Sequence, residues 1–307
     1  MNSNQKSLID GVLEGDRLII GKAISLIENG EKEGFTLLKE IYPLKKDIFV
    51  LGITGPLGVG KSTFIDKIIE KMADDFDKIG VFLCDPSSSI SGGAFLGDRL
   101  RLKTKNENIF IRSMATRNFP YGISPSLPFI IDLFSASPYR NIIVETAGIG
   151  QGDVSIKNFS HLTLVLLSPL LGDEIQFLKG GLMEIGDILI VTKGDYDIAE
   201  PFYKTLKSSI SIFYNDLIPV YMISSSNGFG IDDVYNEIMK RRLDLFSSNK
   251  YLEREKIRRL ETFKYLLREL YTKKMIEKIE KGGDFKEIED GKVNIYQKIL
   301  DIISWTI

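Results

Sequence analysis

The residues best suited to chemistry are 55–62, which read Gly-Pro-Leu-Gly-Val-Gly-Lys-Ser and fit the pattern G-x-x-x-x-G-K-[ST]. In such a loop, glycines let backbone N–H groups turn toward phosphate oxygens. Lys61 would reach the β- and γ-phosphates of a nucleoside triphosphate, and the Ser62 hydroxyl would bind Mg²⁺. The alternative is a glycine-rich turn without function. Because a buried-strand run at 48–54 precedes the segment and an amphipathic helix pattern follows it, we interpret it as a phosphate-binding loop.

Two aspartates form a second candidate group. Asp85 follows the apolar run 81–84, and Asp98 ends a segment rich in serine and glycine. A carboxylate at the C-terminal end of a strand faces the ligand crevice of a parallel sheet, so both aspartates would lie near Mg²⁺, directly or through water. The alternative is a turn in which Asp85 caps its own backbone. The residues alone leave these two readings open.

Glu145 ends another apolar run, 141–145, and leads into Thr146, Ala147 and Gly148. The segment is similar to a D-x-x-G element in which glutamate replaces aspartate. A glycine there lets its N–H approach the γ-phosphate, and the carboxylate supports the water shell of the metal. Loss of the γ-phosphate would release the loop, as in a molecular switch. The alternative is an acidic residue that caps the following turn.

Residues 191–195 read Val-Thr-Lys-Gly-Asp and fit the pattern [NT]-K-x-D, by which GTPases recognise their base. The Asp195 carboxylate would accept hydrogen bonds from guanine N–H groups, while adenine would leave it unpaired. The stem of Lys193 would lie along the base. Thr192 stands where asparagine is commoner, so one side-chain contact would be weaker or mediated by water. Serines 224–226 follow a later strand, where a backbone loop would meet guanine; a surface turn at 193–195 is the alternative.

The elements that would position these residues alternate between short apolar runs and helical patterns. This rhythm predicts an α/β fold, a P-loop NTPase with a mostly parallel central sheet flanked by helices. We expect an N-terminal helical extension at 1–46, a nucleotide-binding domain at 47–247 and a C-terminal helical extension at 248–307. In the first region, Leu18, Ile19, Ala23, Ile24 and Ile27 recur at helical spacing. The predicted strands are 49–54, 81–84, 109–113, 141–145, 162–167, 188–191 and 220–223.

Composition narrows the class of protein. The 40 basic and 42 acidic side chains nearly balance, so charge gives no indication of a nucleic-acid or membrane partner. No apolar run reaches the length of a membrane span, and the polar N-terminus lacks the core of a signal peptide. One cysteine excludes an internal disulfide, and His161, the sole histidine, leaves no His/Cys set for zinc or nickel. We expect a cytoplasmic protein; a mature mitochondrial one is the alternative.

Taken together, the motifs resemble those of the MeaB/MMAA/ArgK family of GTPases, which are chaperone-like partners of cobalamin-dependent acyl-CoA mutases. The likeness covers roughly residues 11–245 and is much weaker in the tail. This sequence departs from the family pattern at Thr192, at Leu170, where glycine is usual, and at His161, where aspartate is common. The matching segments are 15–17, 23–28, 52–55, 58–64, 85–89, 91–93, 97–98, 111–112, 144–146, 148, 150–151, 172–176, 179–181 and 184–185.

The resemblance implies a Mg²⁺-dependent GTP hydrolase that gates cofactor loading of a mutase such as methylmalonyl-CoA mutase and protects or reactivates it. It implies a homodimer formed through the tail, and a third mobile loop at 171–181 that senses the mutase. Lys61 and Glu145 would be catalytic, and Ser62, Asp85, Asp98 and Glu145 would surround the metal. The residues expected at GTP or GDP are Gly55, Gly58, Val59, Gly60, Lys61, Ser62, Thr63, Gly148, Thr192, Lys193, Asp195, Ser224, Ser225 and Ser226.

Two other functions stay open on the residues. One is a scaffold that retains nucleotide without useful turnover, which intact Lys61, Ser62 and Glu145 oppose. The other is an ATP-dependent kinase linked to amino-acid transport, which the segment 192–195 opposes. Arg112 is ambiguous, since it would suit either a phosphate contact or an ordinary surface position.

Overall fold

The structure is a computed structural model, and it describes residues 3–85, 106–116, 122–148, 155–171, 185–214 and 217–282. The chain divides into two compact units, Met1–Arg258 and Arg259–Ile307. The domain boundaries expected at 46/47 and 247/248 stay predictions. No helix in the described ranges combines the length and the apolar character that crossing a membrane requires.

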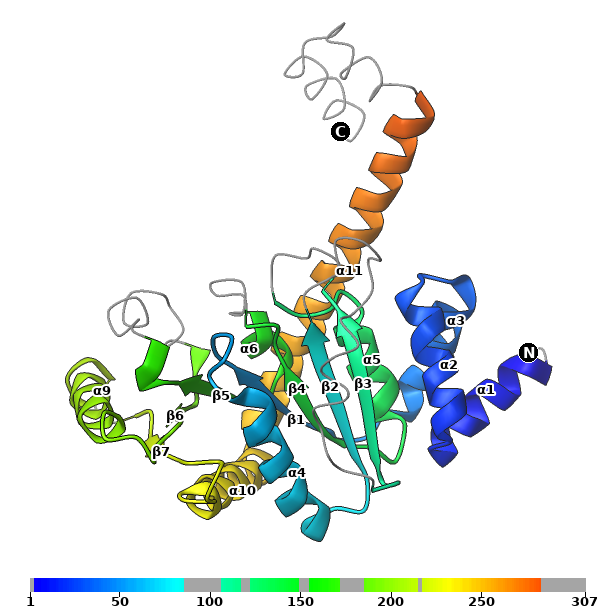
Figure 1. Ribbon diagram of the computed structural model, residues 1–307. Helices are drawn as coiled ribbons and strands as arrows, with labels where there is room; N and C mark the ends of the chain where they lie inside the picture. The colour runs from blue at the N-terminus through cyan, green and yellow to red at the C-terminus, as the bar shows by residue number, and fades with distance from the viewer. Residues whose placement is uncertain are drawn as a thin grey trace, which may run out of the picture. The chain divides into compact units, whose positions relative to one another are not determined.

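In the described residues, seven parallel strands form one sheet in the order β3-β2-β4-β1-β5-β6-β7 (Figure 1). The predicted α/β fold and all seven predicted strands are confirmed. β2 begins two residues earlier than predicted and includes Asp85, while β7 ends one residue earlier. The strands are β1 Phe49–Thr54, β2 Ile79–Asp85, β3 Ile109–Ala115, β4 Asn141–Glu145, β5 Leu162–Leu167, β6 Ile188–Val191 and β7 Val220–Met222.

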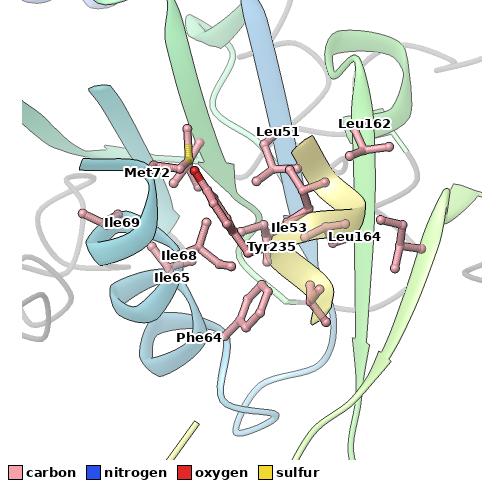
Figure 2. Close-up of a cluster of buried hydrophobic side chains, with 14 of the residues drawn as sticks. Leu51, Ile53, Phe64, Ile65, Ile68, Ile69, Met72, Leu162, Leu164 and Tyr235 are labelled. Atoms are coloured by element: carbon pink, nitrogen blue, oxygen red, sulfur yellow. The ribbon is translucent and has the colours of Figure 1, made fainter. Parts of the chain in front are cut away.

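Helices α4 (Lys61–Asp75) and α10 (Ile231–Ser247) cover one face of the sheet. Their apolar side chains pack on alternate residues of the strands, since successive side chains of a strand point to opposite faces. Figure 2 shows this core, with Phe64 and Ile68 of α4 beside Tyr235 of α10. Strand residues on the same face include Leu51, Ile53, Leu83, Leu162, Leu164 and Ile190.

The opposite face carries α5 (Leu127–Ser135) and α6 (Ile156–Phe159). Phe134 of α5 packs edge-on against Phe82, with ring centroids 4.9 Å apart. Two strand glycines allow the close approach of these helices. A Cβ at Gly52 would lie 2.7 Å from Ile156, and one at Gly80 would lie 3.0 Å from the Phe134 ring.

Three helices precede the sheet: α1 (Ser3–Glu14), α2 (Arg17–Glu28) and α3 (Lys32–Ile41), followed by a short 3₁₀ turn, η1 (Tyr42–Leu44). The Asp16 carboxylate caps α2 by accepting from the N–H groups of residues 18 and 19. The buried face of α2 is Ile20, Ala23, Ile24 and Ile27, whereas Leu18 is exposed. Leu18 thus departs from the predicted apolar stripe, because it lies in the first turn, beyond the packed face.

Three further elements complete the described chain: η3 (Pro169–Leu171), α9 (Ala199–Tyr214) and α11 (Lys250–Gly282). The first turns of α11 are held by buried charges. Arg258 donates to Glu255 at 2.6 and 2.9 Å and to Asp132 of α5 at 2.8 Å. Glu255 in turn lies 3.2 Å from Nε2 of His161, whose Nδ1 accepts from the Val50 N–H. This network joins the start of α11 to the beginning of β1.

Candidate nucleotide-binding site

The loop between β1 and α4 has the backbone that its glycines predict. Gly55, Gly58 and Gly60 all have positive φ, at 146°, 78° and 101°. A Cβ at Gly55 would come within 2.4 Å of the Leu166 carbonyl oxygen of β5, so a side chain is excluded there. Gly60 caps α4, whose first N–H groups lack intrahelical partners and therefore suit an anion.

Lys61 lies inside this loop, with 6 % of its surface exposed. Its Nζ donates to the Gly55 carbonyl at 2.8 Å and to the Pro56 carbonyl at 3.2 Å. Gly148 lies directly across, because a Cβ there would come 2.5 Å from Lys61 Nζ and 2.8 Å from the Gly55 oxygen. The structure therefore brings Gly148 and the loop together.

Side-chain oxygens that could bind a metal lie near the start of α4 and at the carboxyl ends of β2 and β4. The Ser62 hydroxyl lies 3.5 Å from Glu145 Oε1. Asp85, the last residue of β2, is buried, and β2 pairs with β4 through Leu83 and Glu145. Asp98 lies outside the described residues. No cluster of three or more His, Cys, Asp or Glu side chains that could hold a metal occurs among the described residues.

The donor set nevertheless fits Mg²⁺. This ion takes oxygen ligands, keeps several waters, and usually binds through one or two protein groups together with substrate phosphates. The side chains of Ser62 and Glu145 offer only oxygen ligands, and Mg²⁺ does not require a cluster of several carboxylates. His161, by contrast, is enclosed with Glu255 near the start of the strands, so it belongs to another part of the molecule.

Two threonines that the motifs do not mark align the strand ends. Thr54 at the end of β1 and Thr146 just after β4 join their hydroxyls at 2.8 Å, and both are buried. The Thr146 N–H also donates to Ile53, which continues the pairing of β4 with β1. In the sequence, both threonines fall within segments that match the family pattern, 52–55 and 144–146, but no site role was expected for either.

Thr192 connects the segment after β6 to the phosphate-binding loop. Its buried hydroxyl lies 2.8 Å from the Val59 carbonyl and 3.1 Å from the Leu167 carbonyl, and donates toward both. Val59 directs its side chain into the core and only its backbone to the loop. The hydroxyl of Thr192 is therefore engaged within the protein, where sequence reasoning expected a weak contact to the base.

Asp195 and two serines form a hydrogen-bonded chain at the far end of the site. Ser224 Oγ donates to Asp195 Oδ1 at 2.7 Å, and Ser226 Oγ lies 2.7 Å from Ser224 Oγ. Because Ser224 uses its single hydrogen on Asp195, Ser226 is the donor to Ser224. The hydrogen bond from Ser224, with a smaller contribution from Ser226, holds the pKa of Asp195 below its ordinary value. This aspartate therefore stays ionised.

Lys193 has an unusual backbone that shapes the same corner. Its φ is 57°, in the left-handed region that non-glycine residues rarely adopt. The chain then returns so that the Gly194 N–H donates to the Ile223 carbonyl at 2.8 Å. Strain of this kind gathers at binding sites, where the surrounding structure enforces it.

Other predicted residues fall into three groups. Gly58 of the phosphate loop, Thr63 in the first turn of α4 and Ser226 after β7 are exposed, and Ser225 is partly exposed. The third loop predicted at 171–181 lies outside the described residues beyond Leu171. Arg112 does not turn to the phosphate loop: it pairs with Glu28 of α2 at 2.6 Å, because β3 is the edge strand on that side.

A parallel sheet with a glycine loop between β1 and α4, and an Asp195 corner after β6, defines a P-loop nucleotide-binding protein. The family model described as Methylmalonyl Co-A mutase-associated GTPase MeaB matches residues 20–280, and the chain belongs to this family. It is therefore a GTP hydrolase, as the resemblance implied.

Individual relatives agree. The chain is 34 % identical over 302 residues to a Pyrococcus horikoshii protein provisionally named a GTPase, covering 96 % of this chain and 93 % of that protein. It is 36 % identical over 208 residues to a fused isobutyryl-CoA mutase of Cupriavidus metallidurans, covering 66 % of this chain and 19 % of that protein. A solved structure described as a LAO/AO transport system kinase has a TM-score of 0.71 and 21 % identity. It covers 100 % of this chain and 99 % of that one, and it supports the fold alone.

Proposed function

We propose that this GTPase is a nucleotide-controlled chaperone of a cobalamin-dependent acyl-CoA mutase. It gates loading of the cofactor, and it protects or reactivates the mutase. The observation that carries the proposal is the Cupriavidus metallidurans relative, in which a homologous segment belongs to one polypeptide named for an isobutyryl-CoA mutase. Fusion keeps two proteins at a high effective concentration, which favours their interaction. The description of the family points to the same kind of partner.

Hydrolysis in this proposal rests on residues around the phosphate loop. The triphosphate accepts hydrogen bonds from the loop and from the first turn of α4, and Lys61 exchanges its two loop carbonyls for phosphate oxygens. A water molecule attacks the γ-phosphate in line, while Lys61 offsets the charge that develops there. Ser62, Asp85, Asp98 and Glu145 would hold Mg²⁺ directly or through water. When bound, this ion would neutralise negative charge on the β- and γ-phosphates.

Gly148 would report which nucleotide is bound. Its N–H would approach the γ-phosphate when Lys61 turns from the loop carbonyls to the ligand. Loss of that phosphate would remove the contact and release the segment that follows Gly148. We propose that the mutase reads this change, and that it accelerates a slow intrinsic reaction by ordering the segment.

Guanine would be selected at the opposite end of the site. The ionised Asp195 carboxylate would accept from two guanine N–H groups, and Ser224 and Ser226 would keep it oriented. The stem of Lys193 would lie along the base, and Ser225 would face it through the backbone. Thr192 would act indirectly, by holding the Val59 carbonyl.

The decisive experiment measures GTP-dependent reactivation of a purified methylmalonyl-CoA or isobutyryl-CoA mutase whose cofactor has been inactivated. We expect this protein to restore mutase activity with GTP and Mg²⁺. In the variant Lys61→Ala, the rate of phosphate release should fall about 100-fold or more, because Lys61 no longer offsets the negative charge of the transition state. Lys67→Ala, on the exposed side of the same helix, is the matched control and should behave as the unmodified protein. GTP turnover that neither mutase changes, with no reactivation, would refute the partnership while leaving the GTPase intact.

We further propose a homodimer formed through the tail. Leu260, Phe263 and Leu267 of α11 are exposed apolar side chains at helical spacing, within the second unit. Light scattering of the full chain should give twice the monomer mass. The double variant Phe263→Glu, Leu267→Glu should return it to the monomer. A monomeric unmodified protein would refute the dimer.

A further inference from the structure

A hollow lies at the opposite end of the sheet from the phosphate-binding loop. Its volume is about 640 Å³, within the usual range of ligand pockets. Its walls come from the chain at the starts of β1, β2 and β4 and from the ends of α4 and α10. β1 begins in this wall at Phe49 and ends beside the phosphate loop, so its length separates the two sites by about 20 Å.

Arg242 of α10 is the central group of this hollow. Its guanidinium lies 4.8 Å from the ring centroid of Phe76, 5.0 Å from that of Phe246 and 5.6 Å from that of Phe49. Three aromatic rings from three elements therefore hold the cation in place through cation–π attraction. Burial lowers the pKa of Arg242 from its ordinary value, although an arginine stays charged.

Two buried polar atoms in the wall lack a protein partner. Arg242 Nε, a donor, and Asn141 Oδ1, an acceptor, make no hydrogen bond to any residue that the structure describes. No carboxylate is paired with Arg242 among those residues, although Asp47, Asp75 and Asp77 line the same hollow. A buried polar group without a partner is costly, so a complementary ligand would be favoured here.

The charges of the walls limit what that ligand is. A guanidinium binds carboxylates and phosphates through its planar set of donors, and Lys78 and Arg140 add positive charge. The three aspartates oppose a dianion such as phosphate, but a single negative charge is tolerated beside as many cations. The Asn141 oxygen requires a donor next to that charge, and the partly exposed rings of Phe76 and Phe246 suit an apolar carbon body.

We propose that this hollow binds a small organic monocarboxylate that carries a hydrogen-bond donor beside its carboxyl group. The carboxylate accepts from Arg242 Nε, the neighbouring donor bonds Asn141 Oδ1, and the carbon body packs against Phe76 and Phe246. This site is separate from the nucleotide site, and nothing in the GTPase reaction requires it.

Two probes that differ only in the donor test the proposal on the full chain. Mandelate carries a hydroxyl next to its carboxylate, and phenylacetate does not. Calorimetric titration to roughly 20 mM, well above a millimolar Kd, should show mandelate binding about 3- to 10-fold tighter, the value of one hydrogen bond. Asn141→Leu should remove this preference, because the acceptor is lost. Saturating GTP should leave mandelate bound.

Arg242→Lys should weaken mandelate binding about 10-fold or more, because a charge-assisted hydrogen bond is lost while the positive charge stays. Arg241→Lys is the matched control and should change nothing, since Arg241 is committed to Glu237 at 2.7 Å. Thermal unfolding of each variant checks its fold. In the unmodified protein, mandelate should shift the NMR signal of the Arg242 Nε–H. Absence of this shift, equal affinity for the two probes, or tighter binding of inorganic phosphate would each overturn the proposal.

Discussion

At the scale of one residue, Asp195 combines a negative charge, which any exposed aspartate has, with a fixed orientation of its carboxylate. An exposed aspartate is ionised at neutral pH in any protein. Here the Ser224 hydroxyl, itself held by Ser226, donates to Oδ1 of Asp195 and lowers the pKa of this carboxyl further. A carboxylate fixed in this way presents two acceptors to a ligand that has two donors, which is a property of guanine and not of adenine.

Asp195→Asn should replace one carboxylate oxygen, an acceptor, with an NH₂ group, a donor. Two donors, this NH₂ group and a guanine N–H, would then face each other. We expect the affinity for GTP to fall about 100-fold or more, and xanthosine triphosphate, which has a carbonyl at that position, to become the better substrate. Phosphate release with the two nucleotides measures the exchange. The control is Asp197→Asn, an exposed neighbour two residues away. An unchanged preference for GTP would move base selection away from Asp195.

The segments after β4 and after β6 both contact the phosphate loop. Gly148 approaches the loop closely because it has no side chain, and Thr192 donates one hydrogen bond to it. Both contacts join parts of the chain that are far apart in sequence. They make the site depend on how the strand ends align rather than on the loop alone.

Gly148→Ala tests the first of these contacts. The added Cβ would meet Lys61 Nζ and the Gly55 carbonyl, and a φ of 68° is unfavourable for alanine. We expect a loss of about 1–2 kcal/mol of stability and of most GTP turnover. Gly21→Ala is the control, because a Cβ there meets nothing within 4 Å in the middle of α2. That change should add about 0.5–1 kcal/mol in chemical denaturation. Full activity of the Gly148 variant would contradict the close contact.

Thr192→Val tests the second contact by removing a hydroxyl from a side chain of nearly the same shape. The buried Val59 and Leu167 carbonyls would lose a donor, at a cost of about 1–3 kcal/mol. GTP affinity should fall with it, because the phosphate loop loses its tie to β6. Thr192→Ser keeps the hydroxyl and should retain both properties better. Equal losses in the two variants would assign the effect to packing rather than to the hydrogen bonds.

At the scale of the whole first unit, stability depends on the buried charges around His161. Its Nδ1 accepts from the Val50 N–H, and burial lowers the pKa of the imidazole, outweighing the attraction of Glu255. Arg258 and Arg254 oppose its protonation as well. Histidine is therefore neutral in the folded protein and becomes protonated in the unfolded chain as the pH falls below its ordinary pKa.

The free energy of unfolding should accordingly decrease as the pH falls below about 6.5, by up to about 1.4 kcal/mol per pH unit from this group. Glu255, whose pKa is strongly lowered by His161 and Arg258, stays ionised in this range. Urea unfolding at several values between pH 7.5 and pH 5.5 measures the slope. His161→Asn keeps an acceptor for Val50 and should flatten the slope, while lowering stability overall. A slope that persists unchanged in this variant would exclude His161 as its source.

Much of this architecture could be read from local pattern. Apolar runs marked every strand of the described sheet, because a strand buried on both faces must be apolar along its length. The roles of the glycines at 55–60 and of Glu145 could also be predicted from the sequence. Few residue types adopt those backbone angles or bind a hard cation. The boundaries of β2 and the exposure of Leu18 were not, because neighbouring strands and helices decide where pairing and packing end.

By itself, the sequence determined the fold class, the phosphate loop and the position of Asp195 just after a strand, because each depends on residue types at short spacing. Only the tertiary structure decided the contacts across long separations. Thr192 with Val59, Gly148 with Lys61, His161 with Glu255, and Arg242 among three rings are examples. No local pattern encodes these pairs, since they arise when strands distant in sequence are placed side by side and their ends are brought to one edge of the sheet.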